Sequence, residues 1–531
     1  MITVAELLDG HVSLELESLD RLYLNGYVPM LQTGGQVVRF LQEQRGGKVC
    51  SPALLGQNGD AFKAAVNRFA AGHGLTVHEF TRRERKDDTA AVHRASFRGT
   101  EGVYLLGVAQ EKCSAFRSHK HRSSSGRVHF EFNRQPVCVN HYYFYLQDED
   151  FGPAFIKVGT YAPYPIRVCL NGHEWLKRQL AKAGIDFEAL DNGILSCADP
   201  QQLPRIAGRL GPDDIQRFFA KWLDRLPLPL SGADRAAGYG WRLSIWQAEV
   251  SLTQVFTRPV RGRQFFDEVI RENLDLGRPD RIQLLFDRRI TAATPGPFAT
   301  RLIHAGVHPR LHIRYKSCDI KQYFKENRAL RTETTFNNSL DFGIGKDISN
   351  LWQLRRLGGD INRRVLQVER VSQNCALDLD TVDNIIHPTV TEDGQRAPAL
   401  RLAEPRTTAL MAGLLPLAHL PGGFTNAQVR VHVAGLLGPE LSYGPRQMTY
   451  DLRRLRRKGL VERQPDSHRY RLTPLGLRAA AFFTKLDARI FRPAAAAMAP
   501  HDPVPRPLRT AFARLDQAID ELVTEAKLKA S

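Results

Sequence analysis

Apolar and polar residues alternate along the front of the chain in a way that predicts β-strands. Aromatic and β-branched runs of five to seven residues are separated by Gly, Pro and Asp turns. These runs are Val103–Ala109, Val128–Phe132, His141–Leu146, Ala154–Val158 and Ile166–Leu170. The pattern predicts one sheet. The basic stretch Arg117–Arg127 joins the first two runs and has almost nothing to bury, so we expect a mobile loop there.

Helical periodicity follows this section. Residues 173–183 place apolar side chains on one face and end at Gly184, which predicts an amphipathic helix. Residues 185–280 read as mostly helical and include a predicted helix from Trp241 to Val255. A second β-rich section covers 281–340, and a helical segment runs from there to about 370. The clearest unit of the β-rich section is a hairpin of Asp319–Lys325 and Ala329–Phe336.

Together these elements predict a mixed α/β (α+β) chain of several domains, with a β-rich N-terminal body, helical insertions and a smaller C-terminal domain. The stretch Pro388–Pro405 is polar and interrupted by proline, as is typical of a linker. The predicted regions are 1–100 (α/β), 101–184 (β-rich), 185–280 (helical), 281–387 (β-rich and helical), 388–405 (linker), 406–483 (C-terminal domain) and 484–531 (a Pro/Ala segment with an amphipathic helix).

The C-terminal domain reads as helices at 407–415, 426–437 and 445–458, a β-hairpin at 461–473 and a last helix from Pro474. In the third helix Met448, Leu452 and Leu455 have the spacing of a buried stripe. The remaining side chains are then expected to face outward and form a cationic surface. They are Arg446, Gln447, Thr449, Tyr450, Arg453, Arg454, Arg456, Arg457 and Lys458.

The string MTYDLRRLRRKGLVERQPDSHRYRLTPLG closely resembles the winged helix-turn-helix domains of MarR- and ArsR-like regulators. The resemblance covers roughly 75 of the 531 residues, about 405–482; the first 400 or so resemble no family that we recognise. It implies that Gly444–Lys458 is the recognition helix and Val461–Thr473 the wing. It also implies a set of residues nearest the base edges of DNA, namely Arg446, Gln447, Thr449, Tyr450 and Arg453.

Charge supports a polyanionic partner. The chain has 74 Lys and Arg against 56 Asp and Glu, a net charge of +18. Between Arg446 and Arg478 there are ten Arg or Lys and three Asp or Glu, a balance of +7. This imbalance favours DNA, and also RNA, over a neutral small-molecule substrate.

Other features of the sequence exclude several classes of protein. The first residues lack the basic start of a signal peptide, and no run of about 18 apolar residues occurs, so we expect a cytoplasmic protein without a membrane partner. The seven cysteines never form a CxxC pair, which favours buried thiols over disulfides or zinc. No nucleotide-binding motif occurs either.

The richest acidic group is Asp148-Glu-Asp150, just past a predicted strand, with Lys157 near the end of the next one. Two carboxylates at a strand end can hold Mg²⁺ for phosphodiester chemistry, with Lys157 beside the phosphate. Asp148 and Asp150 are therefore the candidate metal ligands, and Glu111 or Glu174 would complete the site. The same residues also fit an ordinary hairpin turn, and this alternative is the favoured one.

Basic residues elsewhere are further candidates for nucleic-acid contact. Lys321, Tyr323 and Lys325 alternate on one strand of the 319–336 hairpin, whose pattern is faintly similar to a hairpin of rolling-circle replication initiators. The metal-binding His motif of those proteins is absent. The remaining candidates are Arg117, Lys120 and Arg122 in the basic stretch and Arg469 and Arg471 in the wing.

These features favour a nucleic-acid-binding protein that processes DNA, as a Mg²⁺-dependent nuclease or a mobile-element strand transferase, and is positioned by its C-terminal domain. A regulator without catalytic activity, or an adaptor that holds a guide-like RNA, stays open as an alternative. At the C-terminus, Leu508, Phe512, Leu515, Ile519 and Leu522 form a short seam that would either dimerise or dock on the protein itself.

Overall fold

The computed structural model divides the chain into two compact units. The sheet unit comprises Ser13–Thr257 and Arg314–Asn362, and the helical unit comprises Met1–Val12, Arg258–Ile313 and Arg363–Ser531. The residues described are 4–47, 50–122, 128–262, 264–265, 268, 282–286, 307–315, 317–326, 328–373, 375–401, 404–420, 422–438, 441–491, 510–511, 513–515, 517–518 and 521.

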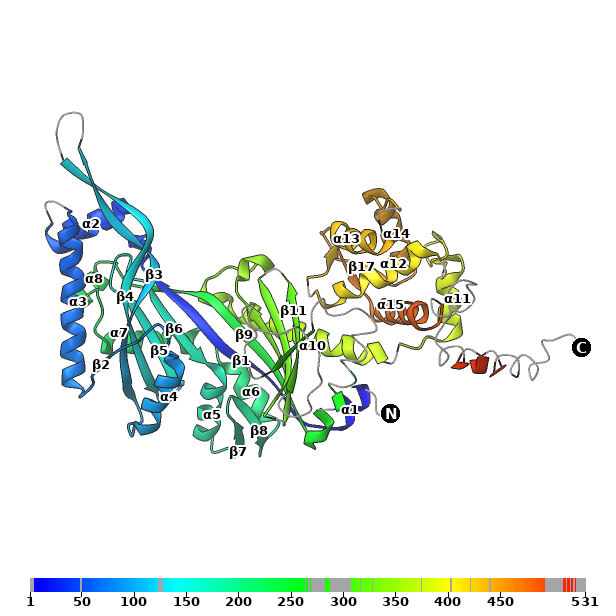
Figure 1. Cartoon of the computed structure of the whole chain (residues 1–531), viewed down its shortest axis with the longest axis horizontal. Helices are drawn as coiled ribbons and strands as arrows, with labels where there is room; N and C mark the ends of the chain where they lie inside the picture. Colours follow the sequence, from blue (N-terminus) through cyan, green and yellow to red (C-terminus); the bar gives the residue numbers. More distant parts are fainter. Residues whose placement is uncertain are drawn as a thin grey trace, which may run out of the picture. The chain divides into compact units, whose positions relative to one another are not determined.

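A large sheet dominates the sheet unit, and Figure 1 shows part of it. Nine strands of this sheet belong to the unit, in the order β12-β13-β9-β1-β6-β5-β4-β3-β2. The bounds are β1 Val12–Tyr27, β2 Val77–Glu79, β3 Gly102–Arg122, β4 Val128–Asp148, β5 Gly152–Gly159, β6 Ile166–Asn171, β9 Arg242–Phe256, β12 Cys318–Lys325 and β13 Ala329–Phe336. β2 pairs with β3 in parallel, whereas β3 through β6 form antiparallel neighbours. The sheet therefore joins regions that lie hundreds of residues apart in the sequence.

Two predictions for this part of the chain are wrong. The regions 101–184, 185–280 and 281–387 are not separate domains, because all three contribute strands to the same sheet. The predicted helix from Trp241 to Val255 is strand β9, whose second half, Ala248–Val255, pairs with β13. The predicted hairpin at 319–336 is confirmed as β12 and β13.

Helices pack on both faces of the sheet. The helical bounds in this unit are α2 Gly34–Arg45, α3 Pro52–Gly72, α4 Lys86–Ser96, α5 Gly172–Lys182, α6 Gln202–Arg209, α7 Pro212–Arg225 and α8 Gly232–Ala236. On one face, Phe62 and Phe69 of α3 contact Tyr142 and Phe144 of β4 edge to face. On the other face, α4 covers part of β3 and β4, and the start of α10 (Leu351–Gln373) covers β9.

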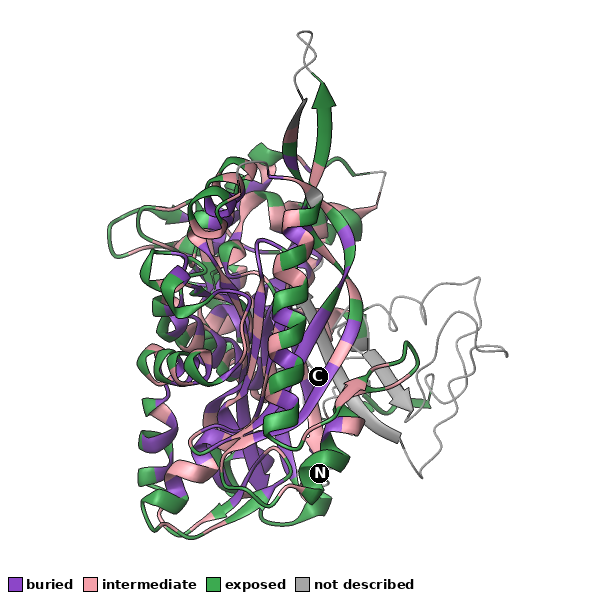
Figure 2. Ribbon diagram, turned by 90° about the vertical axis from the view of Figure 1, so that its left-hand side faces the viewer, coloured by how far each residue is buried: buried purple, intermediate pink, exposed green. Residues whose placement is uncertain are grey.

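β3 and β4 continue beyond the sheet as a two-stranded ribbon, seen at the upper left of Figure 1. Pairing runs out to Arg122 opposite Val128, so the predicted mobile loop Arg117–Arg127 is wrong for residues 117–122. The rest of that stretch, 123–127, lies outside the described residues. The end of the ribbon is mostly exposed (Figure 2), which places its basic side chains in solvent.

The helical unit builds its core from the C-terminal part of the chain. Its elements include α11 Leu379–Ile386, β14 Thr389–Val390, β15 Arg396–Ala397, α12 Pro405–Leu414, β16 Phe424–Thr425, α13 Asn426–Leu437, α14 Pro445–Arg457, β17 Val461–Arg463, β18 Arg469–Leu472 and α15 Pro474–Leu486. The three predicted helices, the hairpin and the last helix are confirmed, with Thr425 as the N-cap of α13.

The predicted linker 388–405 is wrong in part. The residues described there form the β14–β15 hairpin, and Ala397 and Leu400 are fully buried. Leu400 packs in the same core as α12, α14 and α15. The stretch is therefore a structural part of the helical unit, although its polar composition is typical of a linker.

Short elements complete the described chain: α1 Val4–Gly10, β7 Phe187–Leu190, β8 Gly193–Cys197, β10 Ile282–Phe286 and β11 Val307–Tyr315. All seven cysteines are free thiols, but the prediction that they are buried holds only for Cys50, Cys318 and Cys375, and Cys138 is exposed. Among the described helices, none combines the length and apolar character needed to cross a bilayer.

Candidate nucleic-acid interface

Helix α14 begins with strong local signals. Pro445 occupies its first turn, and the side chain of Gln447 accepts a hydrogen bond from the backbone N–H of Gly444 at 2.6 Å. Met448, Leu452 and Leu455 are at most 1% exposed, which confirms the predicted buried stripe. The opposite side of the helix is therefore the side that can meet a partner.

Beyond Pro445, five residues of α14 are exposed: Arg446, Thr449, Tyr450, Arg453 and Arg456. Their spacing of three or four residues places them on one face. Tyr450 is 45% exposed, and the guanidinium carbons of Arg406 and Arg454 lie 5.8 and 5.5 Å from its ring centre. The face thus combines three exposed arginines with an aromatic ring held between two more cations.

The predicted outward direction of Arg454 and Lys458 is wrong, whereas Arg457 is half-buried. Arg454 is 6% exposed and donates to the carbonyl of Ala399. Lys458 is 9% exposed and donates to the carbonyl of His387 at 2.6 Å. Arg457 donates to the carbonyl of Arg396 at 2.8 Å. These three cations bind backbone carbonyls of the 387–399 stretch, so they hold the end of α14 in place.

Asp451 is the residue that sequence reasoning missed on α14. Its side chain is fully buried and accepts hydrogen bonds from Arg406 Nε at 2.8 Å, Arg454 Nη1 at 3.0 Å and Tyr443 Oη at 2.7 Å. Burial and the neighbouring Asp451 carboxylate raise the pKa of Tyr443. The only signal in the sequence is one acid within a basic helix, three residues before an arginine.

The hairpin β17–β18 follows α14 directly. Arg469 donates to the carbonyl of Gly423 at 3.1 Å and is half-buried, so part of its predicted role is structural. Arg471 is exposed on the same strand. Asp466 in the turn has a φ of 50°, the left-handed conformation that Asp tolerates better than most residues.

The ribbon places three predicted contact residues on one strand rather than in a loop. Arg117, Lys120 and Arg122 are all exposed on β3. In the register of the ribbon, Arg117 lies opposite Asn133 and Lys120 opposite Phe130. The charge-bearing part of the ribbon is therefore held by backbone pairing, which fixes the spacing of these cations.

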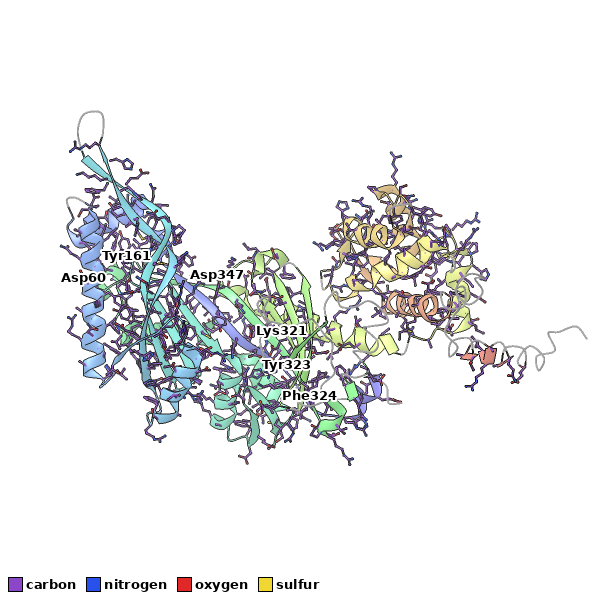
Figure 3. All side chains as sticks on the ribbon, viewed as in Figure 1. Asp60, Tyr161, Lys321, Tyr323, Phe324 and Asp347 are labelled. Carbon is purple, nitrogen blue, oxygen red and sulfur yellow. The ribbon has the colours of Figure 1, made fainter. Side chains whose placement is uncertain are left out.

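The predicted cationic face of the β12–β13 hairpin is largely turned into the protein. Register places Lys321 opposite Glu333 and Tyr323 opposite Arg331, as the alternation predicts. Figure 3 labels Lys321 and Tyr323. However, the Lys325 side chain is only 14% exposed, and Tyr323 Oη donates to Glu333 at 2.6 Å. These residues border a buried polar network rather than an open binding surface.

That network has Arg331 at its centre. Arg331 is fully buried and donates to His173 Nε2 at 3.0 Å and to Asp20 Oδ2 at 3.3 Å. Burial, together with the charge of Arg331, lowers the pKa of His173 to about 3, so the imidazole is neutral. Burial and then the Asp20 charge raise the pKa of Glu333 to about 7. The network links β1, β13 and α5 inside the sheet unit.

Asp148 and Asp150 lie in one turn but bind different partners. Asp148 is 1% exposed; its Oδ1 accepts from the backbone N–H of Asp150 and Phe151, and its Oδ2 from Trp222 Nε1 at 2.8 Å. Asp150 is half exposed and pairs with Lys182 at 2.6 Å. The Asp148 carboxylate thus stabilises the turn, as the alternative interpretation of this motif predicts.

Glu111 and Lys157 are the candidate catalytic residues that the structure brings into contact. Glu111 also binds Lys86 and the Tyr143 hydroxyl, two residues that sequence reasoning missed. Burial alone would raise the pKa of Glu111, but hydrogen bonds from Lys157, Lys86 and Tyr143 outweigh it and lower the pKa to about 2. Glu174 pairs instead with Lys177 at 2.7 Å.

No cluster of three or more His, Cys, Asp or Glu side chains suited to a metal occurs within the described part of the chain. The Mg²⁺ site at Asp148 and Asp150 and the catalytic roles stay predictions from the sequence. The C-terminal seam stays one as well, because its members other than Leu515 lie outside the described residues; Leu515 is 42% exposed.

Comparison with protein-family models, with curated proteins and with solved structures gave no match for this chain.

Proposed function

We propose that this protein binds nucleic acid, and that residues 405–486 form a winged helix-turn-helix domain like those of MarR- and ArsR-like regulators. In this proposal α14 is the recognition helix and β17–β18 the wing. The observation that carries the proposal is the exposed stripe of α14, which bears Arg446, Tyr450, Arg453 and Arg456 opposite a fully buried apolar stripe.

The dimensions of the stripe suit a DNA groove. From Arg446 to Arg456 it extends about 15 Å along the helix at 1.5 Å per residue. An α-helix fits the major groove, where a guanidinium group can donate to two acceptors of guanine or to a phosphate. Our proposal leaves Arg454 and Lys458 out of this interface, because both side chains donate hydrogen bonds to backbone carbonyls of the protein itself.

The basic ribbon supplies a second surface for a polyanion, on the sheet unit. Arg117, Lys120 and Arg122 are exposed, and β-ribbons are known to enter DNA grooves or follow the phosphate backbone. A net charge of +18 favours such contacts over the whole chain. Processing of the bound nucleic acid stays a prediction from the sequence.

The test is duplex binding by the full chain, measured by fluorescence anisotropy over a range of salt concentrations. We expect the triple variant Arg446→Ala, Arg453→Ala, Arg456→Ala to lose at least about tenfold in affinity. The slope of log K against log salt should become shallower by up to about three, at about 0.9 for each phosphate that the variant no longer neutralises.

A matched control removes three other exposed arginines, Arg82, Arg83 and Arg85, from the sheet unit. The control should keep the affinity of the wild type. Equal binding by the wild type and the α14 variant would refute the role of α14, and failure of the wild type to bind any duplex at low salt would refute the proposal as a whole.

A further inference from the structure

A row of aromatic and cationic side chains crosses strands β5, β6, β1 and β9 of the large sheet. Cross-strand register places Phe155 opposite Cys169, which lies opposite Tyr23, and places Lys157 opposite Arg167. Phe155 and Lys157 lie opposite Tyr145 and Tyr143 of β4, so these residues share the face that is turned away from α3, which contacts Tyr142 and Phe144. Trp246 of β9 joins the row through its contact with Tyr23. The row consists of Phe155, Lys157, Arg167, Tyr23 and Trp246.

Trp246 is the most accessible member of the row. Its side chain is 47% exposed, an unusual position for the largest apolar side chain. The guanidinium carbon of Arg167 lies 4.2 Å from its ring centre, and Tyr23 meets it edge to face at 6.0 Å. The indole is thus held in a fixed orientation by two neighbours while nearly half of its surface remains open to a partner.

Arg167 lacks the partner that a partly buried arginine needs. Its Nη1 atom is buried and has no hydrogen-bond acceptor among the residues that the structure describes. Burial, with no carboxylate to offset it, lowers the pKa of Arg167. Its neighbour Lys157, by contrast, pairs with Glu111. Because Nη1 itself is shielded from solvent, a ligand could reach Arg167 only at the part of this half-buried residue that remains accessible, where an acceptor would compensate its charge.

We propose that this row binds a single-stranded nucleic acid, with an unpaired base stacked on Trp246 and an acceptor of the same strand bound by Arg167. Stacking requires an open base face, which unpaired bases offer and duplex bases do not, because each base pair is covered by its neighbours. Arginine and aromatic side chains together are the usual platform for such strands. The site goes beyond the proposed duplex contact of α14 and does not depend on it.

The experiment compares a labelled thymidine oligonucleotide with a duplex of the same length, using the full chain and fluorescence anisotropy. We expect Trp246→Ala to weaken single-strand binding roughly tenfold and Arg167→Ala by a similar factor. Trp246→Phe keeps a stacking surface and should lose less than about threefold. All three variants should bind the duplex within about twofold of the wild type.

Trp352 offers a matched control in the same unit. It is 44% exposed, and the guanidinium carbon of Arg355 lies 5.9 Å from its ring centre, but it lies on α10 rather than in the row. Trp352→Ala should bind single strands like the wild type. In addition, an oligonucleotide carrying 5-iodouracil should cross-link to Trp246 on irradiation, as mapped by mass spectrometry.

Unchanged single-strand affinity in both Trp246→Ala and Arg167→Ala would overturn this inference and leave a protein partner as the occupant of the row. An equal loss in Trp352→Ala would overturn it too, since the effect would then be unspecific. The α14 triple variant separates the two proposals, because it should lose duplex binding and retain single-strand binding.

Discussion

Individual buried charges give the strongest expectations for stability. The Asp451 carboxylate is fully buried, where it binds Arg406, Arg454 and Tyr443. Asp451→Ala leaves Arg454, whose side chain is 8% exposed, without its carboxylate. Breaking a buried ion pair by removing one partner costs about 3–5 kcal/mol. We expect a loss of this size in chemical unfolding of the full chain.

Arg453→Ala is the internal comparison for this substitution. Arg453 lies two residues away on the same helix but is exposed, so its loss should change the free energy of unfolding by no more than about 0.5 kcal/mol. Equal stability of the two variants would mean that Asp451 does not hold α14 in place.

Glu333 predicts a dependence of stability on pH. Burial, followed by the charge of Asp20, raises its pKa to about 7 from an ordinary value of 4.5. The folded state therefore holds this proton more tightly, and the resulting stability is present at low pH and is lost as the pH rises towards 7. Glu333→Gln resembles the protonated form. The free energy of unfolding of Glu333→Gln, relative to that of the wild type, should therefore rise by up to about 3 kcal/mol between pH 5 and pH 8.

Thermal unfolding of both proteins at the two pH values measures this gain. Glu149→Gln removes an exposed carboxylate and serves as the control. A difference between Glu333→Gln and the wild type that stays constant with pH would contradict the assignment of the bound proton to Glu333.

Among whole elements, the β3–β4 ribbon makes a separate prediction. Replacing Arg117, Lys120 and Arg122 with alanine should leave the fold intact, because their side chains are exposed and backbone pairing holds the strand. If the ribbon contacts phosphates, the slope of log K against log salt should become shallower by up to about three. The alanine variant of Arg82, Arg83 and Arg85 is again the control, because it removes the same number of positive charges from another part of the sheet unit. An identical slope in ribbon variant and wild type would exclude phosphate contact by the ribbon.

The elements that the sequence predicts well are those with local signals. Pro445 and Gly459 mark the two ends of α14, and Thr425 with Gln428 forms the capping box of α13. These signals act over three or four residues and need no knowledge of the rest of the fold. The buried stripe of α14 is predictable for the same reason, since helical spacing alone defines it.

The elements that the sequence predicts wrongly depend on distant partners. From Val250 to Phe256 every residue of β9 is buried, because helix α10 and the polar network cover both faces, so the alternation of a half-buried strand is lost. The outer ribbon has the opposite problem. Residues 117–122 are polar on both faces, and only the pairing with β4 makes them a strand.

The candidate nucleic-acid interface also depends on contacts between residues that are distant in the sequence. Helical spacing predicts which α14 residues leave the core, but not that Arg454 and Lys458 turn back to carbonyls of the 384–399 stretch. Their partners lie more than fifty residues away along the chain, where no periodicity links them. The row around Trp246 is equally hard to predict from the sequence, because each of four strands contributes only one or two of its side chains.

At the scale of the whole molecule, the two units should unfold separately because each has its own core. The core of the helical unit contains residues such as Leu410, Leu452 and Leu477, all drawn from the C-terminal part of the chain. The sheet unit has a different buried set, which includes Phe144 and Trp222. Scanning calorimetry of the full chain should therefore resolve two transitions.

Substitutions assign each transition to a unit. Asp451→Ala should lower the midpoint of the helical unit alone. Trp222→Ala should lower the midpoint of the sheet unit alone, since it opens a cavity in that core and removes the hydrogen bond to Asp148, at a cost of about 3–5 kcal/mol. A single transition that both variants shift equally would mean that the units unfold cooperatively. Binding then discriminates further: a saturating duplex should raise the transition that Asp451→Ala lowers, because a ligand stabilises the unit that binds it. It should raise the transition of the sheet unit as well if the β3–β4 ribbon contacts the same duplex.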